Sequence, residues 1–173
     1  MKKLLLVIHD MRIGGAQKSL LSFLQCLCAS PYGKEYEISL MPILPKGPLM
    51  AQLPREVRLV APPKELHWLG TSLRPSLFTK QFSLKGLLGK LRWFTAKGLR
   101  RLPKRLNTQQ KLWHCCHDLI PPCPERYDIA ISYMDGIPNY YVMEKVTAKK
   151  KTLWVHSEYQ MQGYEPAFDA PYF

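Results

Sequence analysis

Short apolar runs alternate along the chain with helical periodicities, and this order predicts an α/β fold. Residues 4–8 are apolar throughout, as in a strand that is buried on both faces of a parallel sheet. After Gly14-Gly15, apolar residues recur at three- and four-residue steps from 16 to 28, and Ser30-Pro31 follows. This pattern predicts a strand, a glycine turn and a helix, in that order.

The rest of the chain repeats the alternation. Strands are predicted at 37–44, 57–60, 128–133 and 151–156, and a helix is predicted at about 139–146. Pro42 favours either an edge position or an early end for the second strand, because proline cannot donate a hydrogen bond to the ladder. Strands that alternate with helices predict a Rossmann-like, doubly wound parallel sheet.

Between the third and fourth predicted strands lies a basic segment, which we interpret as a helical insertion at about 64–124. Residues 64–111 include twelve basic residues and one acid, so they carry +11 of the formal net charge of +12. Apolar residues at three- and four-residue steps from 84 to 102 alternate with lysine and arginine. They predict an amphipathic basic helix, or two helices broken near Gly98.

Three interpretations fit this helix. An anionic membrane would meet the charges while the apolar residues enter the acyl boundary. A nucleic acid would stack on Trp93, Phe94 and Trp113, but no nucleic-acid signature motif is present, so no nucleic-acid partner is expected. Alternatively, the apolar stripe covers the domain and the charges are solvated. The candidate membrane-binding residues are Lys85, Lys90, Arg92, Trp93, Lys97, Arg100 and Arg101.

Polar residues follow three of the predicted strands, at 9–15, 134–136 and 156–158. In open parallel sheets, ligands bind outside the carboxyl ends of the strands, near the point where the strand order reverses. At Gly14-Gly15 the backbone can approach a ligand, and the following helix N-terminus, with Lys18 in its first turn, favours an anion. The alternative is a plain tight turn. The GxGxxG pattern of dinucleotide sites is absent.

Two polar residues and a cysteine cluster leave alternatives open. His156 is either a core histidine bonded to backbone or a hydrogen-bond donor to a sugar hydroxyl or phosphate. Asp135 either orients an acceptor hydroxyl or caps the following helix. Residues 114–117 (His-Cys-Cys-His), with Cys123, suggest zinc, but adjacent cysteines do not easily share one ion and no CxxC pair exists. Reduced thiols and no metal are therefore expected.

The chain start, Met-Lys-Lys-Leu-Leu-Leu-Val-Ile, is similar to the start of a signal peptide. Its apolar run is short and no small-residue cleavage site follows, so we interpret it as the first strand. No stretch of the sequence has the roughly 18 apolar residues of a membrane span. The five cysteines are an odd number without framework spacing, which predicts free thiols in a reducing cytosol.

Several segments together resemble the bacterial family 4 glycosyltransferases, which have the two-domain GT-B fold. Residues 14–21 (Gly-Gly-Ala-Gln-Lys-Ser-Leu-Leu) resemble the turn before their first helix, and residues 127–136 resemble the strand and turn on their acceptor side. Residues 149–159, with Trp154 and His156, resemble their Trp-x-His-Ser strand end, and 163–169 also fit. These segments follow one another in the family's order and spacing.

The resemblance implies that residues 1–173 form the N-terminal, acceptor-side domain of a GT-B fold, with the C-terminal donor-binding domain absent. It implies retaining, metal-independent transfer of a sugar from a nucleotide-diphosphate donor to a cell-surface polysaccharide or lipid-linked acceptor. The expected location is cytoplasmic, at the inner face of the cell membrane. Gly14 and Gly15 would approach the donor diphosphate, His156 would be the catalytic residue contacting the sugar, and Asp135 would lie on the acceptor side.

No cofactor is implied beyond the nucleotide sugar itself, which is a substrate. The family's second half holds a Glu-x7-Glu motif and the basic residues that stabilise the leaving diphosphate. Electrostatic stabilisation of this kind is usually the largest catalytic contribution, so the chain alone is expected to have little or no transferase activity. The competing hypothesis is a non-catalytic basic module that binds a membrane or a partner.

Overall fold

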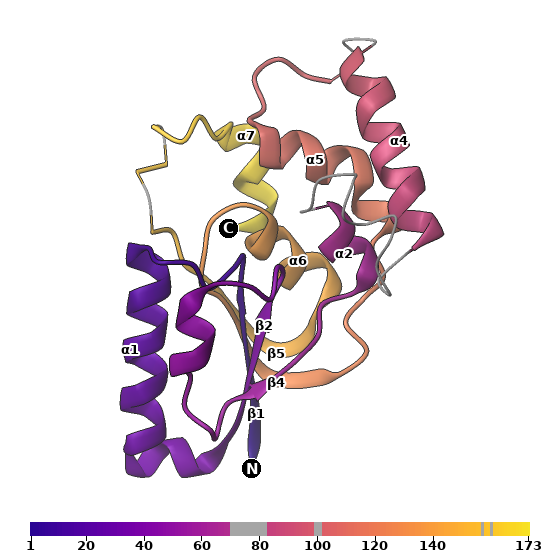
Figure 1. Ribbon diagram of the computed structural model, residues 1–173. Coiled ribbons are helices and arrows are strands. Elements are labelled where there is room, and N and C mark those ends of the chain that lie inside the picture. The colour runs from indigo at the N-terminus through magenta and orange to yellow at the C-terminus, as the bar shows by residue number, and fades with distance from the viewer. Residues whose placement is uncertain (70–82, 99–101, 157, 160) are drawn as a thin grey trace. The chain divides into compact units, whose positions relative to one another are not determined.

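Five parallel strands form one sheet in the computed structural model, which describes residues 1–69, 83–98, 102–156, 158–159 and 161–173 (Figure 1). The strand order within this part of the chain is β3-β2-β1-β4-β5. Helices flank the sheet, so the predicted α/β, Rossmann-like doubly wound fold is confirmed. The strands are β1 (Lys2–Ile8), β2 (Tyr36–Pro42), β3 (Arg58–Leu59), β4 (Arg126–Ser132) and β5 (Thr147–Leu153).

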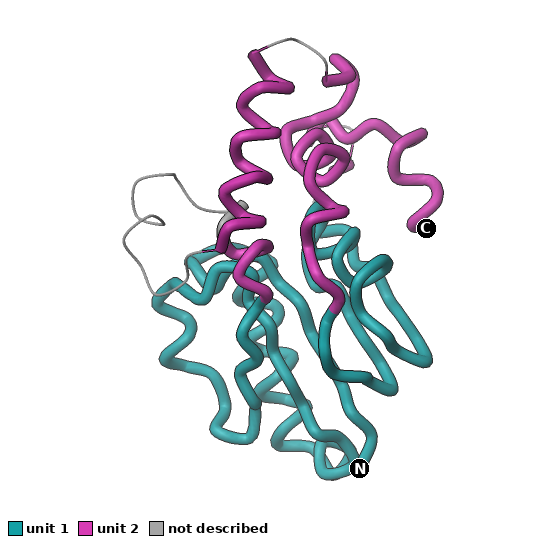
Figure 2. Tube along the Cα trace, turned by 90° about the vertical axis from the view of Figure 1, so that its right-hand side faces the viewer, with its two compact units in different colours: residues 1–62, 123–156 teal, residues 63–122, 157–173 magenta. Residues whose placement is uncertain are grey.

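The chain divides into two compact units (Figure 2). Unit 1 comprises Met1–Pro62 and Cys123–His156, and it holds the sheet together with α1 (Gly15–Ala29) and α6 (Ile137–Lys145). Unit 2 comprises Pro63–Pro122 and Ser157–Phe173. The described helices of unit 2 are α2 (Lys64–Leu69), α4 (Leu84–Gly98), α5 (Thr108–Cys116) and α7 (Pro166–Asp169). Unit 2 therefore joins most of the predicted insertion to the last residues of the chain.

The core of unit 1 forms where α1 packs on the sheet. Leu4, Leu6 and Ile8 of β1 lie in one buried cluster with Leu20 and Leu24 of α1. Each such side chain stabilises the fold by about 1.5–3 kcal/mol when it is fully buried. The helix predicted at 16–28 is confirmed, because its apolar residues meet an apolar strand at helical spacing. Short 3-10 helices, at Pro31–Glu35 and Pro48–Gln52, lie on either side of β2 in sequence.

Two strand boundaries differ from the prediction in informative ways. Pro42 is the last residue of β2, and β2 lies between β3 and β1, so the proline marks an early end and not an edge. β5 begins at Thr147, whereas the sequence pattern predicts a start at 151. Since β5 is an edge strand of the described sheet, most of its side chains are exposed or half-buried. Residues 149–151, three lysines, therefore show no apolar pattern, although Lys150 and Lys151 pair with β4.

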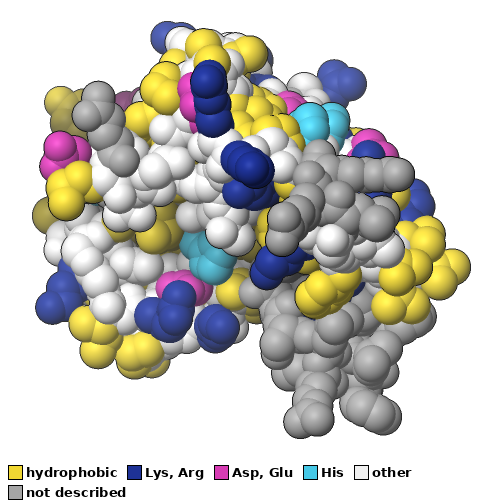
Figure 3. Space-filling view, turned by 90° about the horizontal axis from the view of Figure 1, so that it is seen from above, with side chains coloured by type: hydrophobic (Ala, Val, Ile, Leu, Met, Phe, Trp, Pro, Cys, Tyr) yellow, Lys and Arg dark blue, Asp and Glu magenta, His cyan; other side chains and the backbone are white. Residues whose placement is uncertain are grey.

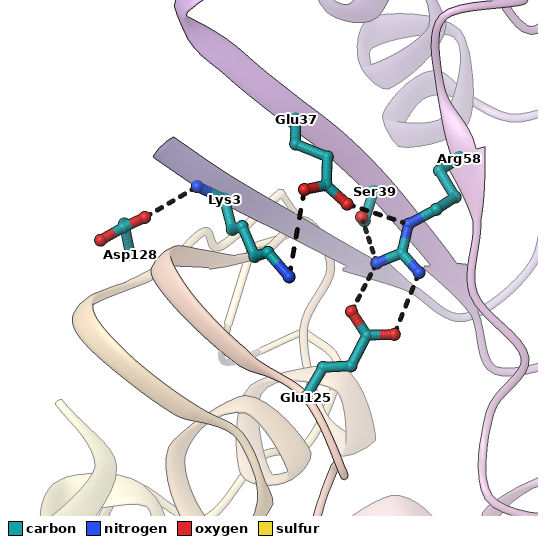
Figure 4. Close-up of polar contacts among 6 residues, drawn as sticks. All are labelled: Lys3, Glu37, Ser39, Arg58, Glu125 and Asp128. Atoms are coloured by element: carbon teal, nitrogen blue, oxygen red, sulfur yellow. Dashed lines mark hydrogen bonds and ion pairs between the residues drawn. The ribbon is translucent and has the colours of Figure 1, made fainter. Parts of the chain in front are cut away.

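Charged side chains link neighbouring strands near their amino ends (Figure 4). Lys149 of β5 lies 2.6 Å from Asp128 of β4, and the backbone N–H of Lys3 donates to the same carboxylate at 2.8 Å. The hydrogen bond from Lys149 holds the pKa of Asp128 below its ordinary value. Lys3 continues the row toward Glu37 of β2, at 4.0 Å. The row crosses four strands and helps to fix their register.

Arg58 anchors the two-residue strand β3. Its guanidinium donates to both carboxylate oxygens of Glu125, at 3.0 and 2.6 Å, and to Oγ of Ser39 at 3.1 Å (Figure 4). The hydrogen bond to Arg58 lowers the pKa of Glu125. A strand this short has few ladder bonds, so the bidentate pair supplies a fixed geometry that the backbone alone lacks.

In unit 2, Gln110 ties the C-terminal segment to α5. Its buried amide accepts from the backbone N–H of Glu165 at 2.9 Å and donates to the backbone carbonyl of Glu165 at 3.0 Å. The same side chain closes a capping box with Asn107 at the start of α5. The side chain of Gln110 thus bonds to backbone groups at the start of α5 and to both backbone groups of Glu165. These bonds hold the C-terminal segment against α5.

Gly47 lets the loops after β1 and β2 meet. Met11 N donates to Lys46 O at 2.9 Å, and Leu49 N donates to Met11 O at 3.2 Å. Gly47 has a φ of 121°, and a Cβ at this position would collide with the carbonyl group of Met11. This conformation is essentially restricted to glycine. Only glycine therefore permits the observed contact of the two loops.

We predict that Gly47→Ala lowers the free energy of unfolding by roughly 2 kcal/mol or more, because backbone strain of about 1–3 kcal/mol adds to the collision with Met11. Urea denaturation measures the loss. Gly98→Ala is the matched control, because a Cβ there meets no atom within 4 Å and its φ is not in the left-handed region. Equal stability of the two variants would contradict the role of Gly47.

Candidate site at the carboxyl edge of the sheet

The strand order reverses between β1 and β4. β1 pairs with β2 on one side and with β4 on the other, all in parallel, so both neighbours end at the same edge as β1. The loops after β1 and β4 flank this switch point, and the loop after β5 lies beside that of β4. The predicted polar segments 9–15 and 134–136, together with His156, therefore lie at one edge, whereas Ser157 lies outside the described residues. Seen from above Figure 1, basic, acidic and histidine side chains are exposed among apolar ones (Figure 3).

The paired glycines begin α1. Gly14 is the N-cap residue with extended backbone, and Gly15 is the first helical residue. No side chain caps this end, and its first turn holds no acidic residue. Neither glycine has a positive φ, so a left-handed turn does not explain them. A Cβ at Gly15 would meet no atom within 4 Å, so the backbone of the helix N-terminus is open on that side. Such an end favours an anion.

Asp10 organises the loop between β1 and α1. Its side chain is only 1% exposed, and it accepts hydrogen bonds from Arg12 N at 3.2 Å, Arg12 Nε at 2.7 Å and Gln17 Nε2 at 3.4 Å. Burial opposes its ionisation, but the hydrogen bonds from Arg12 and from His9 outweigh burial and hold the pKa of Asp10 below its ordinary value. The sequence pattern alone does not distinguish Asp10 as a site residue. The available signal was an acid two residues after a fully apolar strand.

Aromatic rings line the same edge on the α1 side. Tyr133 lies 4.3 Å from Trp154 and 5.0 Å from the His156 ring, centroid to centroid. Phe23 of α1 lies 6.1 Å from Tyr133, whose hydroxyl is 3.0 Å from Ser19 Oγ. His156 is exposed, so its interpretation as a core histidine is wrong. The imidazole is instead a surface group that contacts the rings of Tyr133 and Trp154.

Asp135 ties the loops after β4 and β5 together. Its Oδ1 accepts from the backbone N–H of His156 at 3.1 Å. The N-cap of α6 is Gly136, with a φ of 80°, and as a glycine it has no side chain to cap the helix. The interpretation of Asp135 as a helix cap stays a prediction. The carboxylate fixes the backbone that carries His156.

The basic helix α4 turns a different face inward from the one expected. Of the apolar stripe of α4, Leu84, Leu88, Leu91 and Phe94 are 50–66% exposed and Leu87 is half-buried, so most of the stripe is not covered. The buried residues of the helix are Gly86, Gly89 and Lys90, and the Cys116 thiol donates to Gly89 O at 3.4 Å. Glycine permits this close approach. The interpretation in which the apolar stripe of α4 packs inward while its charges are solvated is therefore wrong.

The predicted membrane-binding residues are placed differently from one another. Lys90 is 5% exposed, and burial lowers its pKa, so it does not lie on the outer face as expected. Arg92 pairs with Asp118 at 2.8 Å, both half exposed. Lys85 and Lys97 are exposed and Trp93 is half-buried. Arg100 and Arg101 lie outside the described residues.

The cysteines are free thiols. Cys115, Cys116 and Cys123 are buried, and burial raises the pKa of Cys116 to about 12. Across the described ranges, no group of three or more histidine, cysteine or acidic side chains is placed to hold a metal ion. Nor does any helix in these ranges combine the length and apolarity that crossing a bilayer requires. Comparison with protein-family models, curated proteins and solved structures found no match.

Acid should destabilise the protein in part through Asp10. Because its folded pKa is lowered, ionised Asp10 contributes stability above its ordinary pKa of about 3.9, and this contribution is lost as the pH falls through the lowered value. Asp10→Asn should therefore lower Tm near neutral pH and reduce the further fall in Tm between about pH 5 and pH 2. Circular dichroism melts at stepped pH measure this, with the exposed Glu56→Gln as control. Parallel acid limbs in wild type and Asp10→Asn would contradict it.

Proposed function

We propose that the chain is the acceptor-side domain of a retaining glycosyltransferase, which transfers a sugar from a nucleotide-diphosphate donor to a cell-surface polysaccharide or lipid-linked acceptor. The observation that carries the proposal is the meeting of three polar loops at the switch point of a parallel sheet. The same loops contain the residues that resemble family 4 glycosyltransferases: Gly14, Gly15, Asp135 and His156.

Each residue has a role that its surroundings allow. The open backbone at Gly15 and the uncapped end of α1 suit the diphosphate of the donor. The exposed imidazole of His156 suits a hydrogen bond to the transferred sugar, and the aromatic contacts limit its orientation. Asp135 positions the His156 backbone, and it lies on the acceptor side in the proposal. No step calls for a metal ion or another cofactor.

Gly15→Ala should leave the stability near that of wild type yet weaken the binding of UDP-glucose and GDP-mannose at least fivefold. The added methyl group meets no protein atom but occupies the space through which a phosphate would approach the backbone. Isothermal titration measures the affinities, and the control is again Gly98→Ala. If Gly15→Ala bound both nucleotide sugars as tightly as wild type, the donor site would not lie at the start of α1.

The competing candidate is a non-catalytic module, and turnover distinguishes the two. In the family that the chain resembles, a second domain holds most of the donor. The proposal therefore expects transfer of a labelled sugar only when such a domain is supplied. Absence of transfer with and without that domain would favour the non-catalytic module.

Association with an anionic membrane surface, at the inner face of the cell membrane, belongs to both candidates. The apolar stripe of α4 is exposed, with Lys85 and Lys97 exposed on the same helix and no acidic residue within it. An anionic lipid surface takes up both kinds of group, since leucine and phenylalanine enter the acyl boundary while lysine meets the headgroups. The charge available for this is smaller than the sequence suggests, because Lys90 is buried and Arg92 is paired.

The double variant Leu88→Ser with Leu91→Ser should bind vesicles containing phosphatidylglycerol at least tenfold more weakly than wild type, since each leucine contributes up to about 1.5–3 kcal/mol on burial. Sedimentation with vesicles across salt concentrations measures this. Tyr32→Ser, at a residue 71% exposed outside α4, is the matched control. Unchanged vesicle binding, or binding to an oligonucleotide and not to vesicles, would reject the membrane assignment of α4.

A further inference from the structure

Arg12 is held at the carboxyl edge of the sheet by a buried carboxylate. Its Nε lies 2.7 Å from Asp10 Oδ2, and its backbone N–H donates to Oδ1 of the same side chain. Asp10 is 1% exposed, whereas the Arg12 side chain is 66% exposed. The pair thus joins a fixed, buried anchor to a guanidinium that faces solvent.

The geometry leaves most of the guanidinium available. An arginine side chain has five N–H donors in a rigid fork, and the contacts with Asp10 use only Nε. The donors on the two Nη atoms form the edge that binds phosphate or carboxylate through two parallel hydrogen bonds. Because Asp10 fixes Nε, the orientation of this edge is partly set before a ligand arrives.

The surroundings of Asp10 keep the anchor in place. Gln17, which is 8% exposed in the first turn of α1, donates to Asp10 Oδ1 at 3.4 Å. Met11, between Asp10 and Arg12, bonds through both backbone groups to the loop around Gly47. The anchor, four residues before Gly14, is therefore attached to β1, α1 and the loop after β2 at once.

We propose that Arg12 binds the diphosphate of the nucleotide-sugar donor and that Asp10 is its positioning residue. This inference rests on the proposed function, and it adds to it a residue that the resemblance did not supply. The competing explanation is that Arg12 only neutralises the buried Asp10. That explanation predicts effects on stability without effects on anion binding, so the two can be separated by experiment.

The test titrates wild type, Arg12→Gln, Arg12→Lys and Asp10→Asn with inorganic pyrophosphate, UDP-glucose and GDP-mannose, and measures Tm for each variant. Arg12→Gln should weaken pyrophosphate and nucleotide-sugar binding by roughly tenfold or more, as for loss of a charge-assisted hydrogen bond. Arg12→Lys should recover part of the affinity, because it keeps the charge and loses the fork. Asp10→Asn should weaken binding less than Arg12→Gln does, although its Tm falls. Arg55→Gln, at an exposed arginine in unit 1, is the control.

The outcomes separate this inference from the proposed function. A lower Tm for Arg12→Gln with affinities within twofold of wild type would overturn the inference and leave the donor site intact. Pyrophosphate binding that depends on Arg12, without any nucleotide-sugar binding even when a donor-binding second domain is supplied, would support the anion contact and contradict the glycosyltransferase proposal. Failure of wild type to bind any of the three probes would overturn the inference, and the proposed function would then be decided by sugar transfer with the second domain supplied.

Discussion

The pairing of β1 with β2 and β4 is the constraint on which the rest of unit 1 depends. Leu5 to Ile8 are completely buried, so the strand has to lie inside the sheet with cover on both faces. Its two neighbours then define the switch point, and its end defines where the loop to α1 begins. A slip of one residue would turn Leu6 and Ile8 away from α1, so the register is strongly specified.

The carboxyl edge is built by local polar contacts on this apolar base. Asp10 holds the loop after β1, Gly47 lets the loop after β2 approach it, and Asp135 links the loops after β4 and β5. Asp10 and Asp135 accept hydrogen bonds from backbone N–H groups of these loops, and Gly47 allows two loop backbones to bond to each other. A rigid edge of this kind is suited to hold Arg12 and His156, for which we propose ligand contacts, in defined positions.

The sequence predicts the fold well because the strongest patterns belong to the buried elements. β1 and α1 meet through their apolar faces, so runs and periodicities report them directly. The pattern predicts only part of β5, because an edge strand that contains Lys149–Lys151 needs no apolar alternation. The periodicity does not predict which face of α4 is buried. Gly86 and Gly89 pack closely although glycine does not contribute to a hydrophobic pattern, and Leu84, Leu88 and Leu91 are exposed. Asp10 and Gln110 escape because spacing does not reveal which polar side chain is buried.

Gln110 has a consequence for the order in which the chain folds during synthesis. All five described strands of unit 1 lie before residue 154, so the sheet can form before residue 165 has emerged from the ribosome. The amide of Gln110, in contrast, finds two of its partners only in the backbone of residue 165. Unit 2 therefore stays incomplete until residue 165, which lies 55 residues after Gln110, has emerged from the ribosome.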